Sequence, residues 1–207
     1  MKRLRVLLFE TIDDPYYNLA FEEAFFLVRA RGAIEDETLR IWRNRDAVVL
    51  GFFRSVEEDV VLDETRRYDT AIVRRFTGGG TVYHDLGNLN YAVTYTGEGV
   101  SRPVDTAYSF LIKGIINALK HLGLVPRIEN TNDIIIYDRK VSGTAASYRW
   151  NTVFFHGSLL VSSNIERLYK LLRIPKKIPK GISPVKYRVT TLSRILRGGI
   201  GFKEVIE

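Results

Sequence analysis

An arginine and glycine motif has the composition of an anion-binding loop. Adjacent glycines let backbone N–H groups approach an anion closely, and arginine offers paired hydrogen bonds to phosphate or carboxylate. A triple glycine by itself is also what a flexible turn would contain. Neither G-x-G-x-x-G nor G-x-x-x-x-G-K-[ST] occurs in the sequence, which excludes a dinucleotide fingerprint and a P-loop. The motif runs Arg74, Arg75, Phe76, Thr77, Gly78, Gly79, Gly80, Thr81, Val82, Tyr83, His84, Asp85, Leu86, Gly87, Asn88.

A single lysine among small residues is the second candidate. Lys140 follows an apolar run and a tight polar turn, and the small residues Ser142, Gly143 and Ala145 beside it leave room for a ligand. A lysine at a turn is also compatible with an ordinary solvated charge. Taken alone, this stretch does not distinguish the two interpretations.

Apolar periodicity predicts the elements that would position these residues. Asp14 and Pro15 form an N-cap and first-turn pair for a helix that ends at Gly32, and a second apolar helix face from Asp105 ends at Gly123. Predicted strands cover residues 3–10, 38–43, 47–50, 71–75, 88–96, 134–137 and 152–161, with a further helix over 60–68. Neighbouring strands are often joined by short turns, which disfavours a regular parallel sheet. We therefore expect an α+β fold with a mixed, mostly antiparallel sheet flanked by helices.

The composition bounds the class of protein. The 207 residues suffice for one domain with a substantial apolar core. Cysteine is absent, which excludes disulfides, thiolate metal sites and a cysteine nucleophile, and fits a reducing compartment. With no signal-like or membrane-spanning apolar segment, we expect a cytoplasmic location. The net charge is +7, and residues 167–197 carry ten Lys or Arg without Asp or Glu, which fits a solvated basic face or a surface for phosphates or an acidic partner.

Taken together and in this order, the two stretches resemble the lipoate-protein ligase A family. R-R-x-[ST]-G-G-G-x-V-Y-H-D-x-G-N is followed by N-D-I-x(4)-R-K-V-S-G-x-A and then by H-G-S-L-L. Supporting fragments lie within residues 14–24, 41–51 and 180–192, so the resemblance extends from about Asp13 to Leu192.

The resemblance implies a fold and a reaction. The fold is the lipoate and biotin ligase catalytic domain, related to class II tRNA synthetase cores. The reaction joins lipoate and ATP into lipoyl-AMP and pyrophosphate, after which a lysine of a carrier domain attacks the acyl group. The implied carriers are the E2 component of 2-oxoacid dehydrogenases and the H protein of glycine cleavage. Neither step needs a nucleophile from the enzyme, so the site must orient groups and stabilise negative charge.

The resemblance also implies residue roles. Lys140 takes the catalytic role, because its point charge suits both a carboxylate and the α-phosphate. Mg²⁺ is expected to arrive with ATP, with Asp133 as a candidate contact to the metal or nucleotide, whereas the three histidines and missing cysteines disfavour zinc. The implied ATP- or adenylate-binding residues are Arg75, Gly78, Gly79, Gly80, Thr81, Val82, Tyr83, Asp133 and Lys140. The implied lipoate-binding residues are His84, Asn88, Lys140, Ser142, Gly143, Ala145 and His156, although His84 could instead be a structural histidine fixed by Asp85.

The sequence also bears on three other functions. An octanoyl or lipoyl transferase of the same fold relies on a cysteine acyl-enzyme, and this chain has no cysteine. A biotin ligase would carry a Gly-Arg-Gly-Arg pattern, which is missing. A nucleic-acid-binding protein would fit the basic charge, but no helix-turn-helix, zinc-finger or RNP pattern is apparent.

The resemblance finally implies a domain organisation. We expect residues 1–207 to form one catalytic domain with a basic segment 174–207, which would act as a mobile flap over the nucleotide or contact a partner. Single-chain family members carry an accessory C-terminal domain after the matching region, and in bipartite members a separate small subunit supplies it. The matching region here is not followed by such a domain, so we expect a separate accessory protein to be needed for activating lipoate, and transfer from preformed lipoyl-AMP without it.

Overall fold

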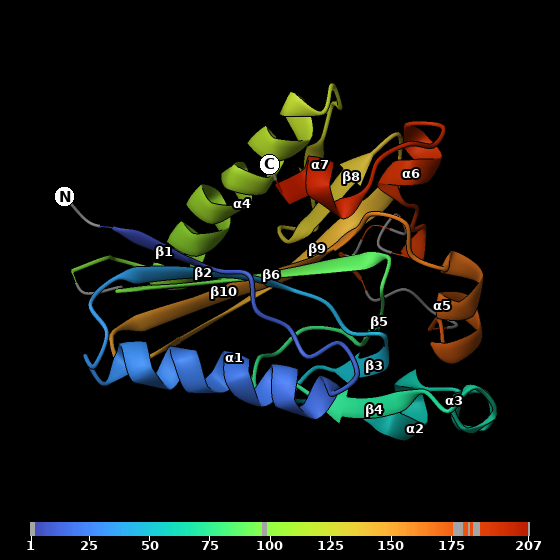
Figure 1. Ribbon diagram of the computed structural model, residues 1–207, viewed down its shortest axis with the longest axis horizontal. Helices are drawn as coiled ribbons and strands as arrows, with labels where there is room; N and C mark the ends of the chain where they lie inside the picture. The colour runs from blue at the N-terminus through green and yellow to red at the C-terminus, as the bar shows by residue number, and fades with distance from the viewer. Residues whose placement is uncertain (1–2, 97–98, 176–179, 182, 184–186, 207) are drawn as a thin grey trace.

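A seven-stranded sheet forms the centre of the computed structural model, which describes residues 3–96, 99–175, 180–181, 183 and 187–206. All neighbouring strands run antiparallel except β1 and β2, which are parallel. Figure 1 shows the long strands β6, β10 and β9 at the middle of this sheet. In spatial order the strands are β1 (Leu4–Leu7), β2 (Glu37–Trp42), β6 (Asn88–Thr96), β10 (Thr152–Leu160), β9 (Arg139–Arg149), β8 (Asp133–Ile136) and β7 (Arg127–Glu129).

The described residues form a second sheet of three strands, and the glycine motif belongs to this sheet. Its order is β4 (Ala71–Arg74), β3 (Asp46–Leu50) and β5 (Val82–Asp85), with β3 parallel to β4 and antiparallel to β5. The motif's glycines lie in the loop that leads from β4 to β5. The position of this sheet therefore decides where that loop lies.

Two long helices cover opposite faces of the large sheet, as Figure 1 shows for α1 (Pro15–Ala30) and α4 (Pro103–His121). Asp14 caps α1 by accepting a hydrogen bond from the Tyr17 backbone N–H at 2.8 Å. Gly32 follows with φ +70°, a conformation that glycine adopts without strain. The shorter helices are α2 (Val56–Asp59), α3 (Leu62–Tyr68), α5 (Ile165–Leu171), α6 (Leu192–Ile195) and α7 (Phe202–Ile206).

Each face of the large sheet buries its own apolar cluster. On the α1 face, Phe25 and Phe26 pack against Phe154 of β10. On the α4 face, Ile112 and Leu119 pack against the sheet, and Phe202 of α7 packs against the same cluster. Full burial of one such side chain contributes roughly 1.5–3 kcal/mol, so both helices are firmly attached to the sheet.

The expected α+β fold with a mixed, mostly antiparallel sheet is confirmed, as are both long helices. The predicted first strand is shorter than expected, covering Leu4–Leu7, and the helix predicted over 60–68 starts at Leu62. Strands β5, β7 and β9 were not predicted. β5 and β7 are only four and three residues long, and small and polar residues obscure the alternation of β9. Residues 176–179, 182 and 184–186 of the predicted mobile flap lie outside the described residues.

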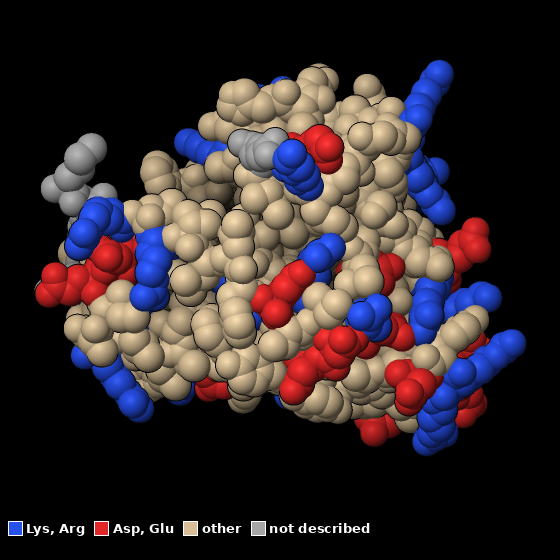
Figure 2. Space-filling view, in the orientation of Figure 1, with Lys and Arg blue, Asp and Glu red and all other residues tan. Residues whose placement is uncertain are grey.

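Charged side chains of both signs are interspersed on the face of the molecule seen in Figure 2. Ion pairs among the described residues include Arg43 with Glu10 and Arg45 with Asp13. Part of the positive charge is therefore balanced by neighbouring carboxylates. Among the described residues, no helix is both long and apolar enough to span a membrane.

Candidate active site

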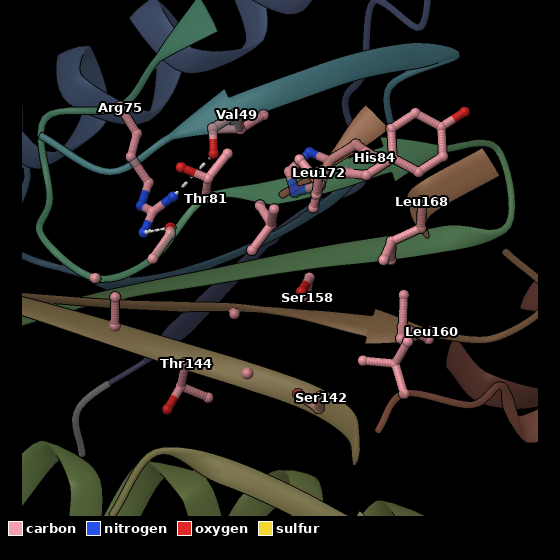
Figure 3. A pocket seen from close by; sticks show the side chains of 18 of the residues that line it. Val49, Arg75, Thr81, His84, Ser142, Thr144, Ser158, Leu160, Leu168 and Leu172 are labelled. Atoms are coloured by element: carbon pink, nitrogen blue, oxygen red, sulfur yellow. Dashed lines mark hydrogen bonds between the residues drawn. The ribbon is translucent and has the colours of Figure 1, made fainter. Parts of the chain in front are cut away.

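A cavity of about 490 Å³ lies between the two sheets, a size typical of small-molecule sites. Figure 3 shows Val49, Arg75, Thr81 and His84 on the side of the small sheet, facing Thr144 and Ser158 on the large sheet. Helix α5 contributes Leu168 at one end. The glycine loop lies close to the large sheet, because a Cβ atom on Gly79 would be 3.8 Å from the Cβ of Ala145. The cavity thus combines apolar walls with polar groups from both sheets.

Lys140 is held on the cavity wall by a buried aspartate. The strands β8 and β9 form a hairpin whose two-residue turn, Tyr137 and Asp138, has positive φ at both positions, as tight hairpins require. Lys140 follows this turn, as the sequence predicted, and its Nζ lies 2.6 Å from Oδ1 of fully buried Asp133. The other carboxylate oxygen, Oδ2, accepts a hydrogen bond from Asn130 at 3.1 Å. The pairing fixes the ammonium group without exposing the carboxylate.

Gly143 makes room for the lysine side chain. A Cβ atom at this position would lie 2.7 Å from Lys140 Nζ and 2.9 Å from its Cε. The ammonium therefore lies directly over the backbone of β9. Any larger residue would displace it.

The C-terminal part of the chain contacts the Lys140 backbone. The Lys140 N–H donates to the carbonyl of Arg188 at 2.8 Å, and the Thr190 N–H donates to the carbonyl of Lys140 at 2.9 Å. The Tyr169 hydroxyl of α5 fixes the same segment by donating to the carbonyl of Tyr187 at 2.9 Å. Residues 187–190 of the basic segment are thus an integral part of the site.

Arg75 organises the glycine loop from within. Its Nη2 donates to the carbonyls of Gly78 at 2.7 Å and Gly80 at 2.8 Å, and its Nε donates to the Thr77 hydroxyl at 3.1 Å. Burial lowers the pKa of the Arg75 guanidinium to about 10, so it remains a cation at neutral pH. The sequence predicted a phosphate contact for Arg75; in the structure its hydrogen bonds hold the loop itself, and a phosphate contact stays a prediction.

A second carboxylate fixes the end of this loop. Thr81 donates to Oδ2 of Asp59, and Arg54 donates to the same oxygen through Nε at 2.7 Å. Burial favours the neutral acid, but the hydrogen bonds from Arg54 and Thr81 prevail and hold the pKa of Asp59 below its ordinary value. Asp59 is therefore a carboxylate that anchors Thr81 at neutral pH.

His156 belongs to a hydrogen-bonded chain that the sequence did not predict. Its Nδ1 lies 3.3 Å from Oε2 of buried Glu22, and its Nε2 lies 2.7 Å from the Thr77 hydroxyl. The other Glu22 oxygen accepts from the Trp42 indole at 2.8 Å. Glu22 could have been suspected, because it is a carboxylate within the apolar pattern of the first helix.

His84 is buried and held neutral. Burial lowers its pKa to about 3, aided by the nearby charge of Arg75. Its Nδ1 lies 3.3 Å from Nδ2 of Asn44. The alternative that Asp85 fixes His84 is wrong, because Asp85 accepts instead from the backbone N–H groups of Gly87 at 2.9 Å and Asn164 at 2.7 Å.

The structure gathers most of the predicted site residues at the cavity. Three of them, Gly78, Asn88 and Asp133, do not line the cavity. The Gly78 carbonyl accepts a hydrogen bond from Arg75, and Asp133 lies behind Lys140. Asn88 is buried beneath the cavity wall and donates to Asn90 Oδ1 at 2.8 Å. The predicted residues that line the cavity are Arg75, Gly79, Gly80, Thr81, Val82, Tyr83, His84, Lys140, Ser142, Gly143, Ala145 and His156.

The mixed sheet carries a cavity with apolar walls, a lysine ammonium and a glycine loop, features of an enzyme site suited to an anionic substrate with an apolar portion. Residues 14–207 match the family described as "Lipoyl protein ligase A/B catalytic domain", and the chain belongs to that family. It is therefore an enzyme of the lipoate-protein ligase type, as the resemblance implied.

Individual relatives agree with this assignment. "Lipoate-protein ligase A subunit 1" of Thermoplasma acidophilum is 30% identical over 181 residues, which cover 83% of this chain and 68% of that protein. The solved structure of a bi-partite lipoate protein ligase from the same organism, studied with its E2 lipoyl domain, has a TM-score of 0.85 and 28% identity, covering 100% of this chain and 80% of that one. A lipoate-protein ligase A bound with ATP has a TM-score of 0.85 and 27% identity, with 100% and 81% covered.

Proposed function

We propose that this chain is the catalytic subunit of a lipoate-protein ligase that activates lipoate with ATP as lipoyl-AMP and transfers the lipoyl group to a lysine of a carrier domain. The observation that carries the proposal is the Lys140 ammonium, held at the cavity wall by Asp133, across from a glycine loop. A related ligase binds ATP, which supports this nucleotide as the co-substrate. We place the reaction in the cytoplasm.

In the activation step, a carboxylate oxygen of lipoate attacks the α-phosphorus of ATP. The bond from that phosphorus to the bridging oxygen breaks, and pyrophosphate leaves. Because negative charge gathers on the α-phosphate oxygens, the Lys140 ammonium would stabilise the transition state. The backbone of residues 79–83 would contact the nucleotide, with its shape maintained by Arg75 and by the contact of Thr81 with Asp59.

In the transfer step, the neutral amine of the carrier lysine attacks the acyl carbon. The carbon–oxygen bond to AMP breaks, AMP leaves, and the amine loses a proton to water. Lys140 would again neutralise charge, first on the carbonyl oxygen and then on the departing phosphate. His84, Ser142, Gly143, Ala145 and His156 would surround the acyl group, whereas Asn88, which the resemblance also implied, would act through its hydrogen bond to Asn90.

Magnesium would reach the site as a complex with ATP. Asp133 does not fit the role of a direct ligand, because Oδ1 pairs with Lys140 and Oδ2 accepts from Asn130. Among the described residues, no group of three or more His, Asp or Glu side chains could hold a metal ion.

A separate accessory protein would complete the activation step. The relative described as a bi-partite ligase supports this proposal, and its E2 lipoyl domain supports a lipoyl domain as the acceptor. The glycine cleavage H protein is the other acceptor class that we propose.

Mass spectrometry of a purified lipoyl domain tests the proposed function. The domain is incubated with the chain and supplied with lipoate, ATP and magnesium, with synthetic lipoyl-AMP, or with an octanoyl thioester. We expect modification from lipoyl-AMP, and from ATP and lipoate only after an accessory protein is added. Modification from ATP without a second protein would refute the need for a partner. Transfer from the thioester alone would refute the ligase.

A further inference from the structure

A pair of aromatic rings is exposed beside the cavity. Phe52 and Phe53 follow β3 directly, and they are 52% and 85% exposed. Their rings meet edge to face, with centroids 4.9 Å apart. A single exposed apolar residue is common on protein surfaces, but adjacent large apolar side chains left in water indicate a binding surface.

The backbone of this loop is held in place by hydrogen bonds. The Phe52 N–H donates to the carbonyl of Thr77 in the glycine loop at 2.8 Å, and the Arg54 N–H donates to the carbonyl of Gly51 at 3.0 Å. Arg74 donates to the carbonyls of Phe52 at 3.1 Å and Arg54 at 2.6 Å. A loop that is already fixed loses little conformational freedom on binding, which favours its use as a contact surface.

The aromatic pair borders the cavity without lining it. Arg54, the next residue, lines the cavity, as does Ile174, which is 51% exposed, whereas neither ring of the pair belongs to the cavity wall in the described part of the chain. Asp59 joins these two parts of the rim. Its carboxylate accepts from Arg54 Nε at 2.7 Å, and its backbone carbonyl accepts from the Arg173 N–H at 2.8 Å.

The reactants of the proposed function differ in whether they can cover this pair. A small molecule inside the cavity leaves both rings in water, because the rings lie outside its walls. The carrier domain must instead bring its lysine to the acyl group beside Lys140. A lysine stem has only four carbons, so the surface of the carrier must lie against the rim of the cavity. The carrier therefore meets the side chains that the rim exposes.

We propose that Phe52, Phe53 and Ile174 form a docking surface for the carrier domain and contact apolar side chains that flank its acceptor lysine. The inference rests on the proposed function for the identity of the carrier. Aromatic residues contribute much of the binding energy of protein interfaces once the partner covers them and excludes water. Phe53 thus affects affinity for the carrier without contacting lipoate or ATP.

The kinetics of transfer from synthetic lipoyl-AMP to a purified lipoyl domain test the docking surface. Initial rates are measured at increasing concentrations of the domain, without an accessory protein, for wild type, Phe53→Ala and Phe53→Leu. Truncating an interface aromatic typically costs about fivefold to thirtyfold in affinity. We expect Phe53→Ala to raise KM for the domain by that factor with kcat unchanged, and Phe53→Leu to recover part of the loss. Phe110→Ala is the matched control, because Phe110 is 71% exposed on α4, across the large sheet from the small one (Figure 1).

Calorimetry separates docking from the chemical step. The probe is a lipoyl domain whose acceptor lysine is replaced by arginine. Wild type should bind this domain more tightly than Phe53→Ala does, while both bind lipoyl-AMP equally.

Two outcomes would overturn the docking surface: a KM for the domain that is unchanged in Phe53→Ala, or a loss confined to activation in the presence of the accessory protein. Transfer by the wild-type chain would leave the proposed function intact in either case. If the wild-type chain transfers no lipoyl group but binds the domain through Phe53, the proposed function fails while the docking surface stands.

Discussion

In the proposed reaction the Lys140 ammonium stabilises negative charge on both the acyl group and the α-phosphate, which requires that its position be fixed. Asp133 and the absence of a side chain at Gly143 together place the ammonium over β9. The sequence indicated Lys140 and Gly143 through the family resemblance. It could not indicate that Asp133 pairs with Lys140, because that contact depends on a hairpin with an irregular register between β8 and β9.

Replacing Gly143 by alanine should impair catalysis more than folding. The added methyl would lie 2.7 Å from Lys140 Nζ, and the flexible lysine rather than the backbone would move. Displacing a catalytic group by about 1 Å can cost about a hundredfold in rate, so we expect a loss of about tenfold to a hundredfold in kcat/KM for lipoyl transfer. Gly114→Ala, in an open position of α4, is the control and should keep full activity. Equal activity of both variants would contradict the proposed placement.

His84 should make the protein sensitive to acid. Its pKa is about 3 in the folded protein and near 6.5 when unfolded, so the unfolded chain binds the extra proton between these values. Stability is therefore retained above pH 6.5 and falls as the pH drops toward 3. Linkage gives a loss of about 2 kcal/mol between pH 7 and pH 5 from this residue. Urea unfolding at both pH values should show a smaller difference for His84→Phe, and an unchanged difference would refute the burial effect.

At the scale of secondary-structure elements, the loop after β3 and the glycine loop between β4 and β5 pack directly against each other. A Cβ atom on Gly51 would lie 2.1 Å from the carbonyl oxygen of Gly79, so the loop after β3 touches the glycine loop directly. Arg74 braces this contact by donating to the carbonyls of Gly51 at 3.0 Å and Phe52 at 3.1 Å. Sequence patterns predicted α1 and α4 well, because caps and glycines mark their ends. They did not predict β9, whose small residues create the cavity at the expense of β-propensity.

Gly51→Ala tests the contact between these loops. Both facing groups are backbone, so neither can rotate away, and overpacking of this kind costs about 1–3 kcal/mol. For a protein of this size each kcal/mol lowers Tm by about 2–4 °C. Thermal unfolding should therefore show a lower Tm for Gly51→Ala and a slightly higher one for Gly114→Ala, since alanine is the better helix former. A Tm of Gly51→Ala equal to that of wild type would show that the loops separate freely.

At the scale of the whole molecule, the site exists because two sheets face each other. The fold class followed from the short connections between strands, and the family from two motifs about 50 residues apart. The contacts of His156 with Glu22 and Thr77 did not follow, because α1, the large sheet and the glycine loop bring these residues together only in the folded protein. Residues 187–190 likewise contact Lys140 from far along the chain.

Single-turnover transfer of the lipoyl group from synthetic lipoyl-AMP to a lipoyl domain tests the central role of Lys140 most directly. Rates are compared for wild type, Lys140→Ala and Lys113→Ala, an exposed lysine of α4 that serves as the control. Removing a preorganised charge from the transition state typically costs about a hundredfold or more, so Lys140→Ala should lose at least that much while Lys113→Ala keeps the wild-type rate. A Lys140→Ala rate close to wild type would contradict the site described above.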